Sequence, residues 1–195
     1  MTSKLVARAL EQQGLSSVLS SRERGEVPVG SDIDDLLARS DVLVLGAAAD
    51  IARRRECGDE VHIYVPSPPL ETTALLVIDA RESLRGTALL RKIGALRLAG
   101  PIGGRIVVDF GALGLEIGQI ALSFGATDLA GPIASRRGLP MLEADDQKKL
   151  VKRREIAGYV ERAGLCPVFV STDDASRIAG SDFAAQSTAR AHVES

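Results

Sequence analysis

The chain has 195 residues, of which 45% are apolar, and this length suits one domain because domains run at roughly 100–200 residues. Aromatic residues make up only 3% and Trp is absent, so a core must be built from Leu, Ile, Val and Ala. A formal net charge of −2 argues against a general nucleic-acid binder. Residues 1–12 lack a secretory pattern, and no apolar run nears the roughly 20 residues of a membrane helix. We therefore expect a cytoplasmic protein without a membrane partner.

The beginning of the chain is predicted to form a short helix and a connection. Residues 3–14 place apolar side chains on one side of a helix. Residues 16–30 are rich in Ser, Gly and charge, which favours a loop. We therefore distinguish residues 1–30 from a single α/β domain over residues 31–178 and a flexible, polar tail over residues 179–195.

Two helices are predicted to open the domain. Ser31 is a suitable N-cap for a short helix over residues 31–38. Ser40 or Asp41 caps a second helix that ends at about Arg55, because the alanine-rich composition of its middle favours helix over strand.

An alternation of strands and helices follows. Four strands are predicted, at residues 61–65, 74–79, 105–110 and 127–131, and residues 168–170 close the ordered part of the chain. Helices are predicted at residues 81–98, 117–124 and 145–162. The second and third strands are continuous apolar runs, as expected of strands covered on both faces. The order predicts an α/β fold with a parallel sheet and flanking helices.

Two stretches carry a resemblance to a known family. Residues 36–65 read LLARSDVLVLGAAADIARRRECGDEVHIYV, and residues 114–170 contain GLEIGQIALSFGATDLAGPI and LVKRREIAGYVERAGLCPVFV. In this order they resemble the first and last parts of the aminofutalosine synthase family, radical S-adenosylmethionine enzymes of the futalosine route to menaquinone. The resemblance implies a partial (β/α) TIM-type barrel in which the first strand neighbours the final ones.

The chain departs from that family where its chemistry lies. In the family, the first strand leads into C-x-x-x-C-x-x-C, which holds an iron–sulfur cluster that binds S-adenosylmethionine. Here PSPPLETTALLVIDA follows Val65 without a cysteine, and Cys57 and Cys166 lie outside the motif. The middle of the barrel is also missing, and residues 134–142 lack the family's His-containing loop. We therefore expect no cofactor, no metal site and two reduced thiols.

The missing half of the barrel has a consequence for assembly. The resemblance implies an open sheet of about four parallel strands, built from strand one and the last three. Parallel strands are normally buried on both faces, and open edges are normally covered or paired. We therefore expect a homodimer, or a complex with a full-length radical S-adenosylmethionine relative.

Three carboxylates are candidates for a site. Asp79, Asp109 and Asp128 each lie at or near the C-terminal end of a predicted strand, where α/β folds bind ligands. Together they would hold a hydroxyl-bearing ligand or a cation, or act as acids and bases. The structural alternative is that Asp79 and Asp109 cap the helices that follow them.

Four other features have a functional and a structural interpretation. The arginines at 53–55 and the basic residues at 148–154 would bind an anion, or lie on solvated helix faces. The loop at 100–104 would cradle a phosphate, or connect a helix to a strand. His62 would be a catalytic base, or a structural histidine inside a strand.

The leading hypothesis is a non-catalytic, radical-SAM-like protein that serves as an accessory or binds a ligand or partner in menaquinone biosynthesis. One alternative is a cluster-independent enzyme that uses the three carboxylates at the strand ends. A second alternative is a generic α/β interaction module.

Overall fold

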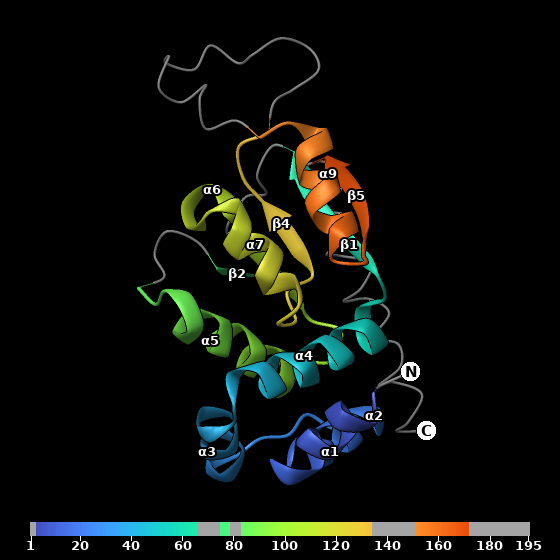
Figure 1. Cartoon of the computed structure of the whole chain (residues 1–195), viewed down its shortest axis with the longest axis vertical. Coiled ribbons are helices and arrows are strands. Elements are labelled where there is room, and N and C mark those ends of the chain that lie inside the picture. Colours follow the sequence, from blue (N-terminus) through green and yellow to red (C-terminus); the bar gives the residue numbers. More distant parts are fainter. Residues whose placement is uncertain (1–2, 66–74, 79–82, 134–150, 172–195) are drawn as a thin grey trace, which may run out of the picture.

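Five parallel strands form one sheet in the computed structural model, which describes residues 3–65, 75–78, 83–133 and 151–171 (Figure 1). The strands are β1 (Glu60–Val65), β2 (Leu75–Ile78), β3 (Arg105–Asp109), β4 (Asp128–Ala130) and β5 (Cys166–Ser171). Their order across the sheet is β2-β3-β4-β1-β5. The predicted α/β class and the four predicted strands are confirmed, and residues 168–170, to which no element was assigned, lie in a fifth strand, β5. A barrel is not confirmed, because β2 and β5 stand at opposite ends of this order.

The first strand neighbours the late strands, as the resemblance implied. β1 pairs with β4 through His62 and Ile63, and with β5 along its whole length. The sheet has five strands where the resemblance implied about four. The additional strand is β5, which pairs with β1 at one end of the sheet, while β2 pairs with β3 at the other.

Helices flank the sheet and make up the N-terminal part of the chain. They are α1 (Lys4–Gln12), α2 (Leu15–Glu23), α3 (Ser31–Arg39), α4 (Val42–Cys57), α5 (Gly86–Ala99), α6 (Phe110–Leu113), α7 (Leu115–Leu122) and α9 (Arg153–Arg162). Asp41 caps α4 as predicted, with its carboxylate accepting from the backbone N–H groups of Leu43 and Val44. Ser31 is not a cap: Gly30 holds the N-cap position of α3, and no side chain bonds there.

The prediction of a connection over residues 16–30 is wrong, because α2 begins at Leu15. Its buried side chains are Leu15, Val18, Leu19 and Arg22, which are spaced as one stripe of a helix. Serines occupy the positions between them and hide the stripe in the composition. Gly14 separates α2 from α1 by adopting a left-handed backbone, with φ of 76°.

The N-terminal helices share a core with α4 and α5. Side chains from α1, α2, α3 and α4 pack together with Leu98 at the end of α5. Small residues let α4 approach its neighbours closely: a Cβ added at Gly46 would lie 2.8 Å from the Phe124 ring. In Figure 1, α1, α2 and α3 therefore form a layer beneath α4 and α5, away from the strands.

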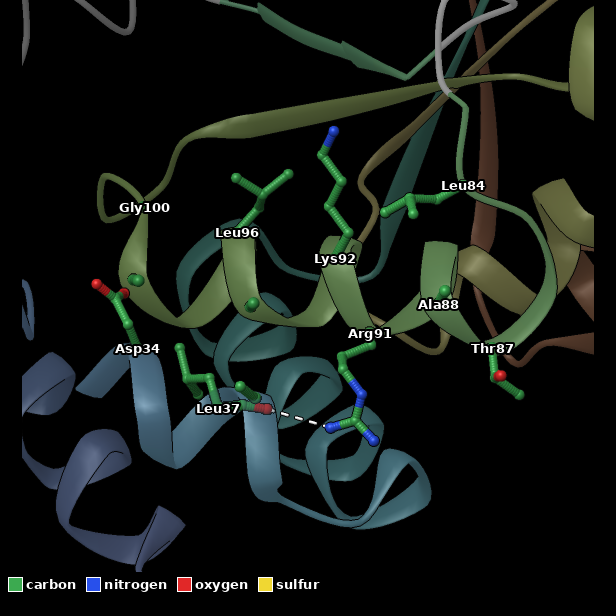
Figure 2. Close-up of a pocket in the computed structure, with 12 residues that line it drawn as sticks. Asp34, Leu37, Leu84, Thr87, Ala88, Arg91, Lys92, Leu96 and Gly100 are labelled. Atoms are coloured by element: carbon green, nitrogen blue, oxygen red, sulfur yellow. Dashed lines mark hydrogen bonds between the residues drawn. The ribbon is translucent and has the colours of Figure 1, made fainter. Parts of the chain in front are cut away.

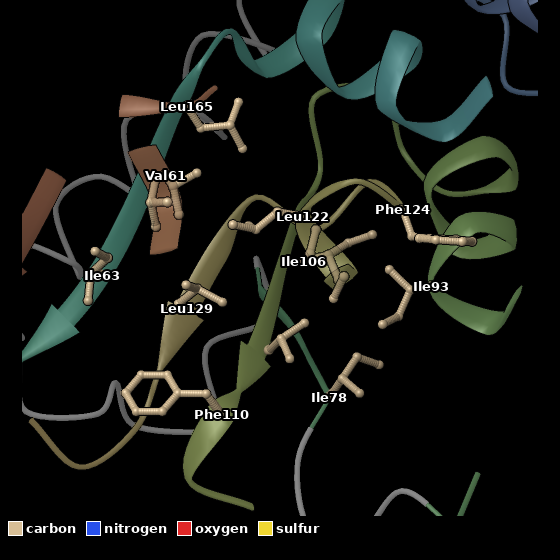
Figure 3. Packing of buried hydrophobic residues seen from close by; sticks show 14 of the residues in the cluster. Val61, Ile63, Ile78, Ile93, Ile106, Phe110, Leu122, Phe124, Leu129 and Leu165 are labelled. Atoms are coloured by element: carbon tan, nitrogen blue, oxygen red, sulfur yellow. The ribbon is translucent and has the colours of Figure 1, made fainter. Parts of the chain in front are cut away.

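Three helices cover the same face of the sheet. Side chains of α5, α7 and α9 join one apolar cluster with residues from all of strands β1 to β4 (Figure 3). Right-handed crossovers place helices on one face when successive strands advance in one direction. The chain advances in this way from β2 through β3 and β4 to β5, passing over β1.

The opposite face of the sheet has an apolar part and a polar part, which follow one another along the strands. Tyr64, Val107, Ala130 and Val170 form a small buried cluster there. Nearer the start of the strands, the same face carries polar side chains, which belong to Arg105, Asp128 and His62.

Candidate functional site

Of the three candidate aspartates, Asp109 lies at the carboxyl end of its strand, and its carboxylate caps a helix. The carboxylate of Asp109 accepts hydrogen bonds from the backbone nitrogens of Gly111 at 2.8 Å and Ala112 at 3.3 Å, at the start of α6. The capping interpretation is therefore confirmed for Asp109. Asp79 lies outside the described residues.

The prediction that Asp128 lies at or near the carboxyl end of its strand is wrong. Asp128 is the first residue of β4, in register with His62 of β1 and Val107 of β3. Asp109 lies opposite Ala130, two residues further along the sheet. The two aspartates are therefore separated by two residues of strand, about 6.6 Å along the sheet.

A buried ion pair engages Asp128. The Arg105 Nε lies 2.8 Å from the Asp128 Oδ2, and its Nη2 donates to the Oδ1. The Thr127 hydroxyl lies 3.0 Å from the same carboxylate, which is fully buried. Burial disfavours the charge of Arg105, but the hydrogen bonds and the negative charge of Asp128 outweigh it and raise the pKa of the guanidinium.

His62 lies beside this pair. Its side chain is 11% exposed, with Nδ1 3.8 Å from the Asp128 Oδ1 and Nε2 4.0 Å from the Glu60 Oε2. The position inside β1 fits the structural interpretation of this histidine.

A second charged group extends from the same end of the sheet and centres on Glu56. Arg22 contacts both oxygens of Glu56, at 2.6 and 2.8 Å. The Glu56 Oε2 also accepts from the backbone nitrogen of Gly103 at 3.0 Å and lies 3.6 Å from the Arg97 Nη1. One carboxylate thus balances two buried guanidinium groups.

Arg97 and Arg22 also bind backbone oxygens. Arg97 donates from Nε to the Gly125 carbonyl at 2.9 Å, and burial lowers its pKa. Arg22 donates from Nη1 to the carbonyls of Leu98 and Gly100, at 2.9 and 2.8 Å. These carbonyls end α5, where a cation is favoured.

The two cysteines are free thiols, as expected. Cys57 ends α4 with its Sγ 3.8 Å from the Arg97 Nη1, and Cys166 is exposed. Burial raises the pKa of the Cys57 thiol, and the positive charges of Arg97 and Arg105 only partly oppose this. Two cysteines do not supply the thiolates that a radical S-adenosylmethionine cluster takes from its protein, so these residues do not fit that cofactor.

The three arginines at 53–55 differ in how far they are exposed to solvent. The solvated interpretation is wrong for Arg53, which is fully buried and donates to Asp50 and to the Gly58 carbonyl. It holds for Arg54 and Arg55, which are exposed and form ion pairs.

The basic residues at 148–154 are only partly described. Residues 148–150 lie outside the described part of the chain, and Lys152, Arg153 and Arg154 are exposed, with Arg153 placed over the Phe169 ring. The loop at 100–104 joins α5 to β3, as the structural interpretation expected.

Sequence reasoning missed the cluster around Glu56. Arg22 was not singled out because it lay in the predicted connection, yet its spacing from Leu15, Val18 and Leu19 was the available signal. Glu56 and Arg97 carried no signal, because nothing in their neighbours distinguishes a buried charge from an exposed one.

Comparison with known proteins finds no relative: no family model, no curated protein and no solved structure matches the chain. Within the described residues, no three acidic, histidine or cysteine side chains gather as metal ligands. None of the described helices combines the length and the apolar composition needed to cross a membrane. The chain is therefore characterised by its fold and its buried charges.

Proposed function

We propose that the chain is a non-catalytic relative of the aminofutalosine synthase family that acts as an accessory, partner-binding subunit in menaquinone biosynthesis. The observation that carries the non-catalytic part is the use of both described candidate carboxylates inside the fold. Asp109 accepts backbone N–H groups at the start of α6, and Asp128 is paired with Arg105. Neither arrangement leaves the free carboxylate that an acid or base requires.

The family part of the proposal includes a partial (β/α) barrel. What supports it is the covering of one sheet face by α5, α7 and α9, as on the outside of a barrel, together with the pairing of β1 with the late strand β4. The sequence resemblance of residues 36–65 and 114–170 is the other support.

Anaerobic reconstitution with iron and sulfide tests the non-catalytic proposal. We expect iron and acid-labile sulfide far below one cluster per chain, and no difference between the natural protein and a variant with Cys57→Ser and Cys166→Ser. A stoichiometric cluster that the double serine variant loses would refute the proposal. The serine variant separates true ligation from iron bound non-specifically.

Association tests the partner-binding part. We expect a homodimer at micromolar concentration, measured by light scattering after size-exclusion chromatography and repeated at tenfold dilution. A monomeric mass at both concentrations rules out the homodimer. The same measurement after mixing with a full-length aminofutalosine synthase then decides the hetero-complex, and a monomer there as well refutes partner binding to that family.

A further inference from the structure

A groove of about 670 Å³ runs between α3 and α5, on the side of α5 that turns away from α4 (Figure 2). Its polar lining is limited to Asp34, Thr87, Arg91 and Lys92. Most of its lining is apolar, and includes Leu37, Leu84, Ala88, Ala95, Leu96 and Ala99. The groove exists because α5 presents short alanine side chains where longer ones would fill the space.

The walls of the groove are braced. Arg91 reaches from α5 to α3, where its Nη1 donates to the carbonyl oxygen of Leu37 at 3.2 Å (Figure 2). The same nitrogen donates to the carbonyl oxygen of Ser40 at 2.6 Å. Leu37 is itself buried in the N-terminal core. A ligand would therefore meet a preformed site, which is the common condition of small-molecule pockets of about 300–1,000 Å³.

The dimensions suit an elongated small molecule. The groove follows α5 from Thr87 to Gly100, which at 1.5 Å per residue is about 20 Å. Its volume of about 670 Å³ lies within the range of about 300–1,000 Å³ that is common for small-molecule pockets.

The chemistry of the lining disfavours an extended peptide. A peptide would place its backbone N–H and C=O groups against alanine and leucine side chains, where unpaired polar groups are costly. A hydrocarbon chain has no such groups. The Arg91 guanidinium lies on the α3 side of α5, and the carboxylate of Asp34 lies toward the Gly100 end of the groove (Figure 2).

We infer that the groove is a binding site for an elongated apolar molecule with one anionic end, such as a long-chain carboxylate, whose head lies near Arg91 and whose tail lies along the alanines of α5. The tail gains from the removal of its apolar surface from water. The head gains from the guanidinium, of which the two described hydrogen bonds use only Nη1. The site does not depend on the proposed family or on the sheet carboxylates.

Fluorescence titration with dansylamino-undecanoate tests this inference, with its methyl ester as the uncharged probe. We expect saturable binding of one acid per chain, competition by hexadecanoate, and at least tenfold weaker binding of the ester. Ala88→Phe fills the groove and should weaken binding of the acid at least tenfold. The matched control is Ala112→Phe, on the exposed face of α6, which should bind as the natural protein does.

Arg91→Gln removes the charge, and because glutamine is two bonds shorter than arginine it also loses the hydrogen bonds to the α3 carbonyls. Circular dichroism therefore checks the fold, and unchanged binding of the ester shows that the groove is intact. The acid should bind about tenfold more weakly. Equal binding of acid and ester to the natural protein would overturn the anionic head. Unchanged binding in Ala88→Phe, or the absence of saturable binding, would overturn the site itself.

Discussion

The buried ion pair between Arg22 and Glu56 is expected to be one of the main supports of the fold. Its two side chains are 2% and 8% exposed, and Glu56 also faces Arg97 at 3.6 Å. Glu56→Gln keeps the shape but leaves two buried guanidinium groups without their anion. Removing one partner of a buried pair costs about 3–5 kcal/mol. With a urea slope of about 2 kcal/mol per molar, the midpoint of unfolding should fall by about 1.5–2.5 M.

The matched control for this prediction lies a few residues away. Arg24 and Glu26 form a pair with the same chemistry at 2.8 Å, but their side chains are 58% and 59% exposed. Glu26→Gln should leave the urea midpoint unchanged within error, because water replaces the lost contact. Urea unfolding followed by circular dichroism measures both variants. A shift below about 0.5 M for Glu56→Gln, or equal shifts for both, would refute the argument from burial.

Three further predictions concern single positions. Asp109→Ala should cost about 1 kcal/mol by thermal or urea unfolding while Asp109→Asn stays close to the natural protein, since Asn caps helices as well as Asp does; equal losses would contradict the cap. Gly131→Ala should cost about 1–3 kcal/mol, because φ is 155° and the new Cβ would lie 2.6 Å from the Phe110 ring, and Phe110→Leu should recover part of that loss in the double variant. Cys166 should react with iodoacetamide before Cys57, because Cys166 is exposed and the raised pKa of Cys57 leaves less thiolate at neutral pH. The rate for Cys57 should rise only at higher pH, which peptide mass spectrometry measures. The reverse order of reaction would show that the Cys57 thiol is activated.

The strands were the part of the fold that the sequence predicted best. Apolar runs such as residues 74–79 and 105–110 form β2 and β3 within a residue or two of the predicted ends. Such runs are informative because a buried parallel strand needs apolar residues on both faces. Strand order was less accessible, since the insertion of β1 between β4 and β5 depends on crossovers that leave no local pattern.

The candidate site was predicted less well, and for a physical reason. Three aspartates near strand ends look alike in sequence, but Asp128 is the first residue of a strand only three residues long, not the residue at its carboxyl end. There Arg105 neutralises it. Burial of charge depends on partners that are distant in sequence, such as the 23 positions between these two residues.

The buried charges join the N-terminal helices to a part of the α/β unit that is distant in sequence. Arg22 is 76 positions from Leu98, yet it donates to the carbonyls of Leu98 and Gly100 that α5 leaves without helical partners. Glu56 holds the same arginine while binding the Gly103 nitrogen in the loop that leads into β3. A segment of α2 thus completes the end of a helix in the α/β unit. Because α5 also forms one wall of the groove, α2 helps to fix the end of that wall near Gly100.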